Sequence, residues 1–245
     1  MKFFAIGGGN LALGDPENPY NLEEINEEIV KFANKKCPRF LYLGFNIRAD
    51  YYFSHLKKIF MAKGCQCEYL RFSEFENTKT VENKFKRADI IFLPGGNTLE
   101  YMKKIRKFGL GEYIKGAAER GTVIAGISAG AIIGFEFGCS DSRKSESVPK
   151  KYTKVKGLGI FKGIIAPHFS NSNRVHDIKR MLALSKSGTI AFAIDECAAF
   201  VIDDENYRVI KSNSDAKVFK CYYDSGEYRC IEINNSGNLK DLYQK

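Results

Sequence analysis

The sequence lacks any long uninterrupted apolar run and any cysteine spacing typical of a disulfide framework. A membrane-spanning helix needs roughly 18 consecutive apolar residues. The first apolar run, Phe3–Ile6, ends at Gly7, which is also too early for the core of a signal peptide. The seven cysteines are odd in number and scattered, as expected for reduced thiols inside a cell. These absences predict a soluble cytoplasmic protein.

The sequence also has fewer acidic than basic residues, with 29 Asp and Glu against 38 Lys and Arg, which gives a formal net charge of +9. A basic excess can favour nucleic acids or acidic small substrates. The basic clusters at 84–87 and 103–107 fall on segments with helical spacing, where Lys and Arg usually form the solvated face. They do not form the motif, with basic and aromatic residues interleaved on one face, that is typical of nucleic-acid binding. We therefore expect neither a nucleic-acid nor a membrane partner.

Hydrophobic residues make up 44% of the chain and charged residues 27%, which is ordinary for a globular protein. Short apolar strands, glycine-rich turns and amphipathic helices alternate along the first two thirds, and this order predicts a mostly parallel sheet covered by helices. The last third contains short runs rich in β-branched and aromatic residues, which predict an antiparallel hairpin extension over about 207–233. No repeat or linker interrupts the pattern, so we predict a single α/β domain spanning 1–245.

The strongest local motif is Gly126-Ile127-Ser128-Ala129-Gly130, which lies between a buried strand and an apolar helix start. This is the G-x-S-x-G pattern in its strand–turn–helix context. Small residues on both sides allow a sharp turn that lifts the Ser128 hydroxyl above the sheet. The motif predicts that Ser128 is a nucleophile.

A serine nucleophile needs a base, and the chain has three histidines, His55, His168 and His176. His168 follows a short apolar strand, at the same kind of strand end as Ser128, where catalytic groups of open α/β sheets collect. The other two fall on expected helices. We therefore predict His168 as the general base.

The acid that orients the histidine is less sharply indicated. Asp141 follows Ser128 by thirteen residues and gives the order Ser, Asp, His. Glu136 is an alternative that lies nearer to Ser128 in the sequence, and Asp195 and Glu196 are alternatives that follow an expected strand at 190–193. The residues alone leave these four carboxylates open.

Two backbone N–H groups should stabilise the oxyanion that forms when serine attacks a carbonyl. Ala129 would supply one, directly after the nucleophile. The segment Pro94-Gly95-Gly96-Asn97-Thr98 would supply the other, because paired glycines at a strand end let the backbone approach a ligand closely. A third glycine-rich turn, Gly7-Gly8-Gly9, formally fits a dinucleotide-binding pattern but lacks the required helix and acid. We expect it to line the rim of the active site.

Four motifs taken together resemble a known family. Pro94–Thr98, Gly126–Ala131, Ser140–Ser142 and Pro167–Phe169 occur in the order found in the peptidase E family of serine peptidases. This family includes the aspartyl dipeptidases and, more distantly, cyanophycinase. The similarity spans roughly residues 1–200.

The resemblance implies a flavodoxin-like three-layer α/β sandwich, related to the class I glutamine amidotransferases, in which serine replaces the elbow cysteine. It implies Ser128 as nucleophile, His168 as base and Asp141 as orienting acid, with Gly96 and Ala129 forming the oxyanion hole. Substrate would contact residues at three further positions, namely Gly95, Asn97 and Arg174. No metal or organic cofactor is implied.

We therefore predict a cytoplasmic serine peptidase that cleaves short peptides, with an acidic N-terminal residue as a candidate preference, acting as a monomer or homodimer. Two alternatives use the same motifs. An esterase of the α/β-hydrolase fold shares the elbow and the Ser, acid, His order. A non-catalytic domain would keep the elbow as a small-molecule pocket.

Overall fold

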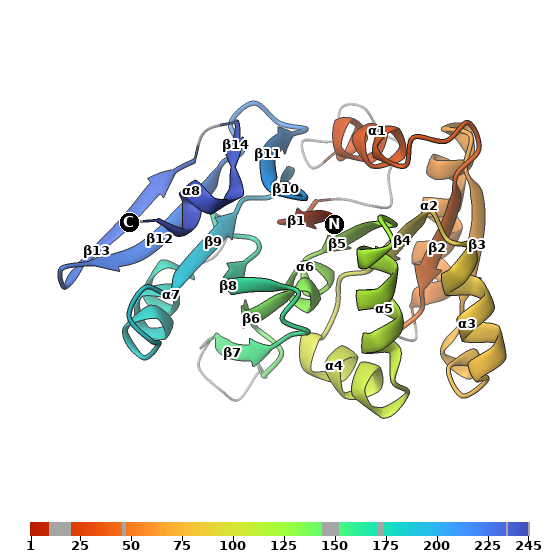
Figure 1. Ribbon diagram of the computed structural model, residues 1–245, viewed down its shortest axis with the longest axis horizontal. Helices are drawn as coiled ribbons and strands as arrows, with labels where there is room; N and C mark the ends of the chain where they lie inside the picture. Colours follow the sequence, from red (N-terminus) through yellow and green to blue (C-terminus); the bar gives the residue numbers. More distant parts are fainter. Residues whose placement is uncertain (10–20, 46–47, 144–151, 171–173, 234, 245) are drawn as a thin grey trace.

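The computed structural model describes all residues except 10–20, 46–47, 144–151, 171–173, 234 and 245. It is a mixed α/β protein in which parallel strands are flanked by helices, as in a flavodoxin-like sandwich (Figure 1). The predicted fold class is therefore confirmed. The strands are divided between two sheets rather than gathered in one sheet with a terminal extension.

The first sheet has the order β14-β11-β10-β1-β5-β4-β2-β3. Strands β1, β5, β4, β2 and β3 run parallel, and β10, β11 and β14 extend the sheet antiparallel on the other side of β1. The parallel strands are almost fully buried, as expected when helices cover both faces. The strands are β1 (Lys2–Ile6), β2 (Arg39–Leu43), β3 (Gln66–Leu70), β4 (Ile90–Leu93), β5 (Val123–Ile127), β10 (Ala198–Asp203), β11 (Asn206–Lys211) and β14 (Ser236–Asn238).

The second sheet has the order β13-β12-β9-β8-β6-β7. Its central strands β6, β8 and β9 are parallel, whereas β7, β12 and β13 are antiparallel to their neighbours. One face joins the main core through Phe161, Ile165 and Phe192. The other face joins a smaller core through Ile164 and Ala191. The strands are β6 (Phe135–Ser140), β7 (Thr153–Lys156), β8 (Phe161–Ala166), β9 (Ile190–Ile194), β12 (Val218–Asp224) and β13 (Glu227–Glu232).

Helices complete the layers around the two sheets. In Figure 1, α1 and α2 lie on one side of the first sheet and α3, α4 and α5 on the other, while α7 covers the second sheet. Within the described part of the chain, none of these helices combines the length and apolar character that crossing a bilayer requires. The helices are α1 (Glu23–Phe32), α2 (Ala49–Ala62), α3 (Thr78–Arg87), α4 (Thr98–Lys107), α5 (Leu110–Glu119), α6 (Ala129–Gly134), α7 (Arg174–Ala183) and α8 (Leu239–Tyr243), with a 3₁₀ turn at Phe72–Glu74.

Two features differ from the sequence expectation. The segment after the elbow contains β6 and β7, two strands that the sequence pattern did not indicate. The late strands do not form one extension, because β11 pairs with β10 in the first sheet and the β12–β13 hairpin pairs with β9 in the second. Both differences arise from long-range pairing, which local periodicity does not encode.

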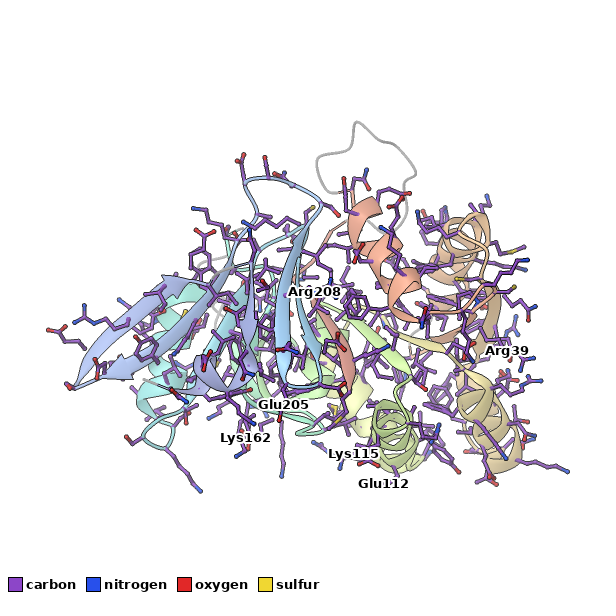
Figure 2. The ribbon with its side chains drawn as sticks, turned by 45° about the horizontal axis from the view of Figure 1, so that its top comes forward. Arg39, Glu112, Lys115, Lys162, Glu205 and Arg208 are labelled. Carbon is purple, nitrogen blue, oxygen red and sulfur yellow. The ribbon has the colours of Figure 1, made fainter. Side chains whose placement is uncertain are left out.

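Charged side chains cover the helix surfaces. Figure 2 shows Glu112 and Lys115 together on α5, where their charged atoms lie 3.6 Å apart. Most basic residues of 84–87 and 103–107 are in the last turns of α3 and α4, where the negative end of the helix dipole stabilises positive charge. Lys86, Arg87 and Lys107 are exposed, as expected for a solvated face. Lys84 differs, because its side chain is 18% exposed and its amino group pairs with Glu74.

Candidate active site

Ser128 lies at a sharp turn where β5 ends and α6 begins. Its backbone has φ 54° and ψ −112°, a conformation that residues with a side chain rarely adopt. A Cβ on Gly126 would lie 2.3 Å from the carbonyl oxygen of Gly130, and a Cβ on Gly130 would lie 1.9 Å from the carbonyl oxygen of Leu93. Both glycines are therefore required, because any side chain would collide with backbone that cannot move aside.

The hydroxyl of Ser128 is close to a histidine ring. Nε2 of His168 lies 2.7 Å from Oγ of Ser128, a distance at which the ring can accept the hydroxyl proton. His168 follows β8 and has a positive φ of 56°. His55 is instead on α2, and His176 is exposed on α7. The structure thus brings His168, and neither of the other histidines, to Ser128.

The carboxylate beside His168 belongs to Glu196. Oε1 of Glu196 makes a short contact with Nδ1 of His168, and these side chains are 19% and 29% exposed. This corrects the prediction for Asp141, which is exposed after β6. The reason is topological: β8 lies between β6 and β9, and the turn that reaches Nδ1 is the one after β9. Glu136, another alternative, accepts a hydrogen bond from the backbone of Gly163 at 2.9 Å.

The turn Gly7-Gly8-Gly9 joins the two sheets beneath this pair. The backbone N–H of His168 donates to the carbonyl of Gly7 at 3.1 Å, and that of Cys197 donates to the carbonyl of Gly8 at 3.0 Å. A Cβ on Gly8 would lie 2.0 Å from Oε2 of Glu196 and 2.5 Å from Nδ1 of His168. The turn therefore packs directly against the two side chains that face Ser128.

Asp195 has a different place from its neighbour Glu196. It is 6% exposed, and its Oδ1 accepts hydrogen bonds from the backbone N–H and the hydroxyl of Ser170. Its Oδ2 accepts one from the backbone N–H of Lys217 at 3.0 Å. Asp195 thus ties the segment after His168 to the start of β12, and its carboxylate is used in holding backbone.

The expected oxyanion residues lie around Ser128. A Cβ on Gly95 would be 3.4 Å from Cβ of Ser128, so this turn passes directly beside the nucleophile. Gly96 is exposed and has φ 149°, a conformation that favours glycine. Ala129 is the first residue of α6 and is buried.

Asn97, expected to contact substrate, is used within the protein. Its Oδ1 accepts a hydrogen bond from the backbone N–H of Glu100 at 3.1 Å and so caps α4. Its Nδ2 donates to the carbonyl of Ser142 at 3.2 Å. The side chain therefore holds the Gly95–Gly96 turn to the segment after β6, and the expected substrate contact of Asn97, which is exposed, stays a prediction.

Arg174, also expected to bind substrate, is 3% exposed. Its guanidinium donates to the carbonyl of Cys139 and lies over the ring of Tyr152, 4.2 Å from the ring centre. Because it is enclosed in this way, Arg174 does not present a charge to solvent. The sequence placed it correctly at the start of α7 but could not show that the helix turns this residue inward.

The buried thiols of Cys139 and Cys197 are poorly suited to act as nucleophiles. Burial raises the pKa of Cys139 to about 11, and burial together with the nearby Glu196 raises the pKa of Cys197 to about 11. Both thiols therefore stay protonated near neutral pH, and the thiolate is the reactive form. Neither thiol therefore competes with the Ser128 hydroxyl as the candidate nucleophile.

A serine at a strained strand-to-helix turn, with a histidine and a carboxylate in line, defines the class of serine hydrolases built on an α/β fold. The family model described as peptidase family S51 matches residues 3–210. The chain belongs to peptidase family S51 and is a serine-type peptidase. This agrees with the resemblance that the sequence motifs indicate.

Individual relatives agree with this assignment. The chain is 27% identical over 221 residues to an uncharacterized peptidase, YgaJ, of Bacillus subtilis (strain 168), covering 89% of this chain and 91% of that protein. It is 34% identical over 86 residues to peptidase E of Citrobacter koseri, covering 35% of this chain and 36% of that protein.

Two solved structures have a similar fold. A peptidase from an acI-B1 actinobacterium matches with a TM-score of 0.71 and 20% identity, covering 97% of this chain and 96% of the other. A putative peptidase E protein from Listeria monocytogenes EGD-e matches with a TM-score of 0.62 and 14% identity, covering 86% of this chain and 98% of the other.

Proposed function

We propose that this chain hydrolyses short peptides through an acyl-enzyme formed on Ser128. The proposal rests on the alignment of three groups, namely the Ser128 hydroxyl, the His168 ring and the Glu196 carboxylate. Oγ of Ser128 lies 2.7 Å from Nε2 of His168, and Glu196 contacts Nδ1 of the same ring. Membership of a serine peptidase family supports peptide bonds as the target.

In the first step, His168 Nε2 takes the proton of Ser128 as Oγ attacks the carbonyl carbon of the scissile peptide bond. Glu196 accepts a hydrogen bond from Nδ1, which fixes the tautomer and stabilises the imidazolium that forms. The protonated ring then gives its proton to the leaving amine. The product is an ester between Ser128 and the acyl part of the peptide.

In the second step, water replaces the amine. His168 takes a proton from this water as the water oxygen attacks the ester carbonyl. The protonated ring then gives that proton to Oγ of Ser128 as the ester bond breaks, which releases the acid product and restores both side chains. In both steps the backbone N–H groups of Gly96 and Ala129 would donate to the oxyanion. Two observations support this assignment. The Gly95 turn passes directly beside Ser128, and α6 begins at Ala129, directly after the nucleophile.

The proposed substrates are short peptides, acted on by a cytoplasmic monomer or homodimer. We do not assign a preference for an acidic N-terminal residue to Arg174, because the residue is 3% exposed and its guanidinium donates to the carbonyl of Cys139. If the enzyme prefers such substrates, the cation that selects them lies elsewhere.

The test is hydrolysis of a dipeptide panel and of an N-terminal aspartyl chromogenic amide by wild type and Ser128→Ala. Labelling of Ser128 by a fluorophosphonate is measured in parallel. We expect turnover and labelling in the wild type and neither in the variant. Turnover of esters without peptides would favour the esterase alternative, whereas neither turnover nor labelling would favour a non-catalytic binding domain.

A further inference from the structure

The β12–β13 hairpin places two cysteines opposite each other. Cys221 on β12 is the direct partner of Cys230 on β13. The hairpin turns through residues 225–226, both with positive φ, and the pair that closes this two-residue turn is Asp224 and Glu227. In such a turn the closing pair exchanges backbone hydrogen bonds, and bonded and non-bonded pairs then alternate. Cys221 and Cys230, three pairs further on, form a non-hydrogen-bonded pair.

This position is suited to a disulfide. Opposite residues in a non-hydrogen-bonded pair have Cα atoms about 4.5 Å apart and side chains on the same face. Disulfides need Cα atoms roughly 4.4–6.8 Å apart. The bond between Cys221 and Cys230 could therefore form with only a small adjustment of the strands.

The two thiols differ in access and in acidity. Cys230 is half-buried, whereas Cys221 is 0% exposed and belongs to the core beneath α7. Hydrogen bonding with Cys221 lowers the pKa of the Cys230 thiol, and Tyr228 and the charge of Lys179 on α7 act in the same direction against the effect of burial. The same coupling, added to burial, raises the pKa of Cys221. Cys230 is thus the more accessible and more acidic thiol of the pair, and Cys221 is the buried one.

Four further thiols, three buried and one half-buried, are less acidic than an ordinary thiol. Burial raises the pKa of Cys65 to about 12 and the pKa values of Cys67, Cys139 and Cys197 to about 11. Cys37 is exposed, so it can react with an oxidant and must be removed before the hairpin thiols are studied.

We propose that Cys221 and Cys230 form a thiol–disulfide exchange site that accepts low-molecular-weight disulfides. The Cys230 thiolate attacks one sulfur of the external disulfide, forming a mixed disulfide and expelling a thiolate that takes a proton from water. Cys221 then loses its proton to water and attacks Sγ of Cys230. The bond between Cys221 and Cys230 forms, and the second external thiol leaves. Two protein thiols are oxidised while one external disulfide is reduced to two thiols.

Oxidation at this site would fix the hairpin next to the strand that leads to Glu196. Cys221 pairs with Ala191 of β9, and the start of β12 is held by Asp195, the residue before Glu196. The exchange chemistry itself uses neither Ser128 nor its partners. The proposal therefore stands or falls independently of the peptidase reaction.

The experiment treats the full chain carrying Cys37→Ser with oxidised glutathione and follows intact mass and disulfide-mapped peptides. We expect the mass to fall by about 2 Da, because two thiol hydrogens are lost, with Cys221 joined to Cys230 and the change reversed by dithiothreitol. Adding Cys221→Ser should trap the mixed disulfide on Cys230, a gain of about 305 Da. Adding Cys230→Ser should leave Cys221 reduced, because it is buried.

A glutathione adduct that persists on Cys230 of the Cys37→Ser protein would overturn the proposal, as would pairing of Cys230 with a different cysteine or no reaction at Cys230. These outcomes are read from the protein with both hairpin cysteines intact, so they do not depend on how the serine variants fold. Fluorophosphonate labelling of Ser128 should be equal before and after oxidation in the same sample, which checks that the fold is retained.

Discussion

Gly8 touches the histidine–carboxylate pair but carries no chemistry of its own. Replacing it with alanine adds one methyl group, which would lie 2.0 Å from Oε2 of Glu196 and 2.5 Å from Cε1 and Nδ1 of His168. The φ of Gly8 is outside the left-handed region, so alanine adds no backbone strain there. We predict that Gly8→Ala impairs the reactivity of Ser128 while the protein stays folded.

The size of the effect follows from these contacts. A carbon–oxygen distance of 2.0 Å is far inside van der Waals separation, so the carboxylate of Glu196 must move by about 1 Å or more. Misplacement of a reacting group by 1 Å costs on the order of 100-fold in rate. Complete loss of the acid that orients a catalytic histidine costs about 10⁴-fold. We therefore expect the labelling rate of Ser128 to fall by about 10²- to 10⁴-fold.

The assay is the second-order rate constant for fluorophosphonate labelling, which reports activation of Ser128 without requiring a known substrate. Gly116→Ala is the matched control, because Gly116 lies within α5 and its added Cβ would meet only the flexible end of Arg120 at 3.4 Å. Alanine favours a helix interior by about 1 kcal/mol over glycine, so the control should be at least as stable as wild type and label at the same rate.

Labelling of Gly8→Ala at the wild-type rate, with an unchanged melting temperature, would refute the reasoning. It would mean that the turn can move away from His168 and Glu196 without disturbing them. Equal losses in Gly8→Ala and Gly116→Ala would instead show a general effect of added methyl groups.

Three further predictions concern the same site. Glu196→Gln should lower the labelling rate by about 10³-fold or more, whereas Asp141→Asn should change it by less than about threefold, since Asp141 is exposed; the reverse order would restore Asp141 as the orienting acid. Ser128→Gly should be more stable than Ser128→Ala by about 1 kcal/mol in urea unfolding, because glycine relieves the φ of 54°; equal stability would argue against backbone strain. Asp195→Ala should lower the free energy of unfolding by about 2–4 kcal/mol, because the backbone N–H groups of Ser170 and Lys217 lose the buried carboxylate that accepts from them; a loss below about 1 kcal/mol would contradict that role.

The sequence placed the elbow correctly because its requirements are local. A strand must turn sharply into a helix, and only small residues at Gly126 and Gly130 avoid the backbone they would otherwise meet. The candidate histidine could also be identified from the sequence, because His168 follows an apolar strand while His55 and His176 fall on helices.

The acid could not be chosen in this way. Glu196 is 28 residues from His168, and several carboxylates lie near strand ends in this chain. The choice depends on the order of β6, β8 and β9 in the second sheet. The order Ser, Asp, His and the resemblance to the peptidase E family favoured Asp141, but neither specifies which turn lies against His168 and Gly8 in the folded chain.

The sequence alone therefore determined the α/β class, most strand and helix positions and the place of Ser128, because periodicity and steric needs at a turn are properties of neighbouring residues. Only the tertiary structure decided that the strands form two sheets, that Glu196 faces His168, that Arg174 is turned inward and that Cys221 meets Cys230. Each of these depends on strand pairing and helix packing between distant segments, which no local pattern specifies.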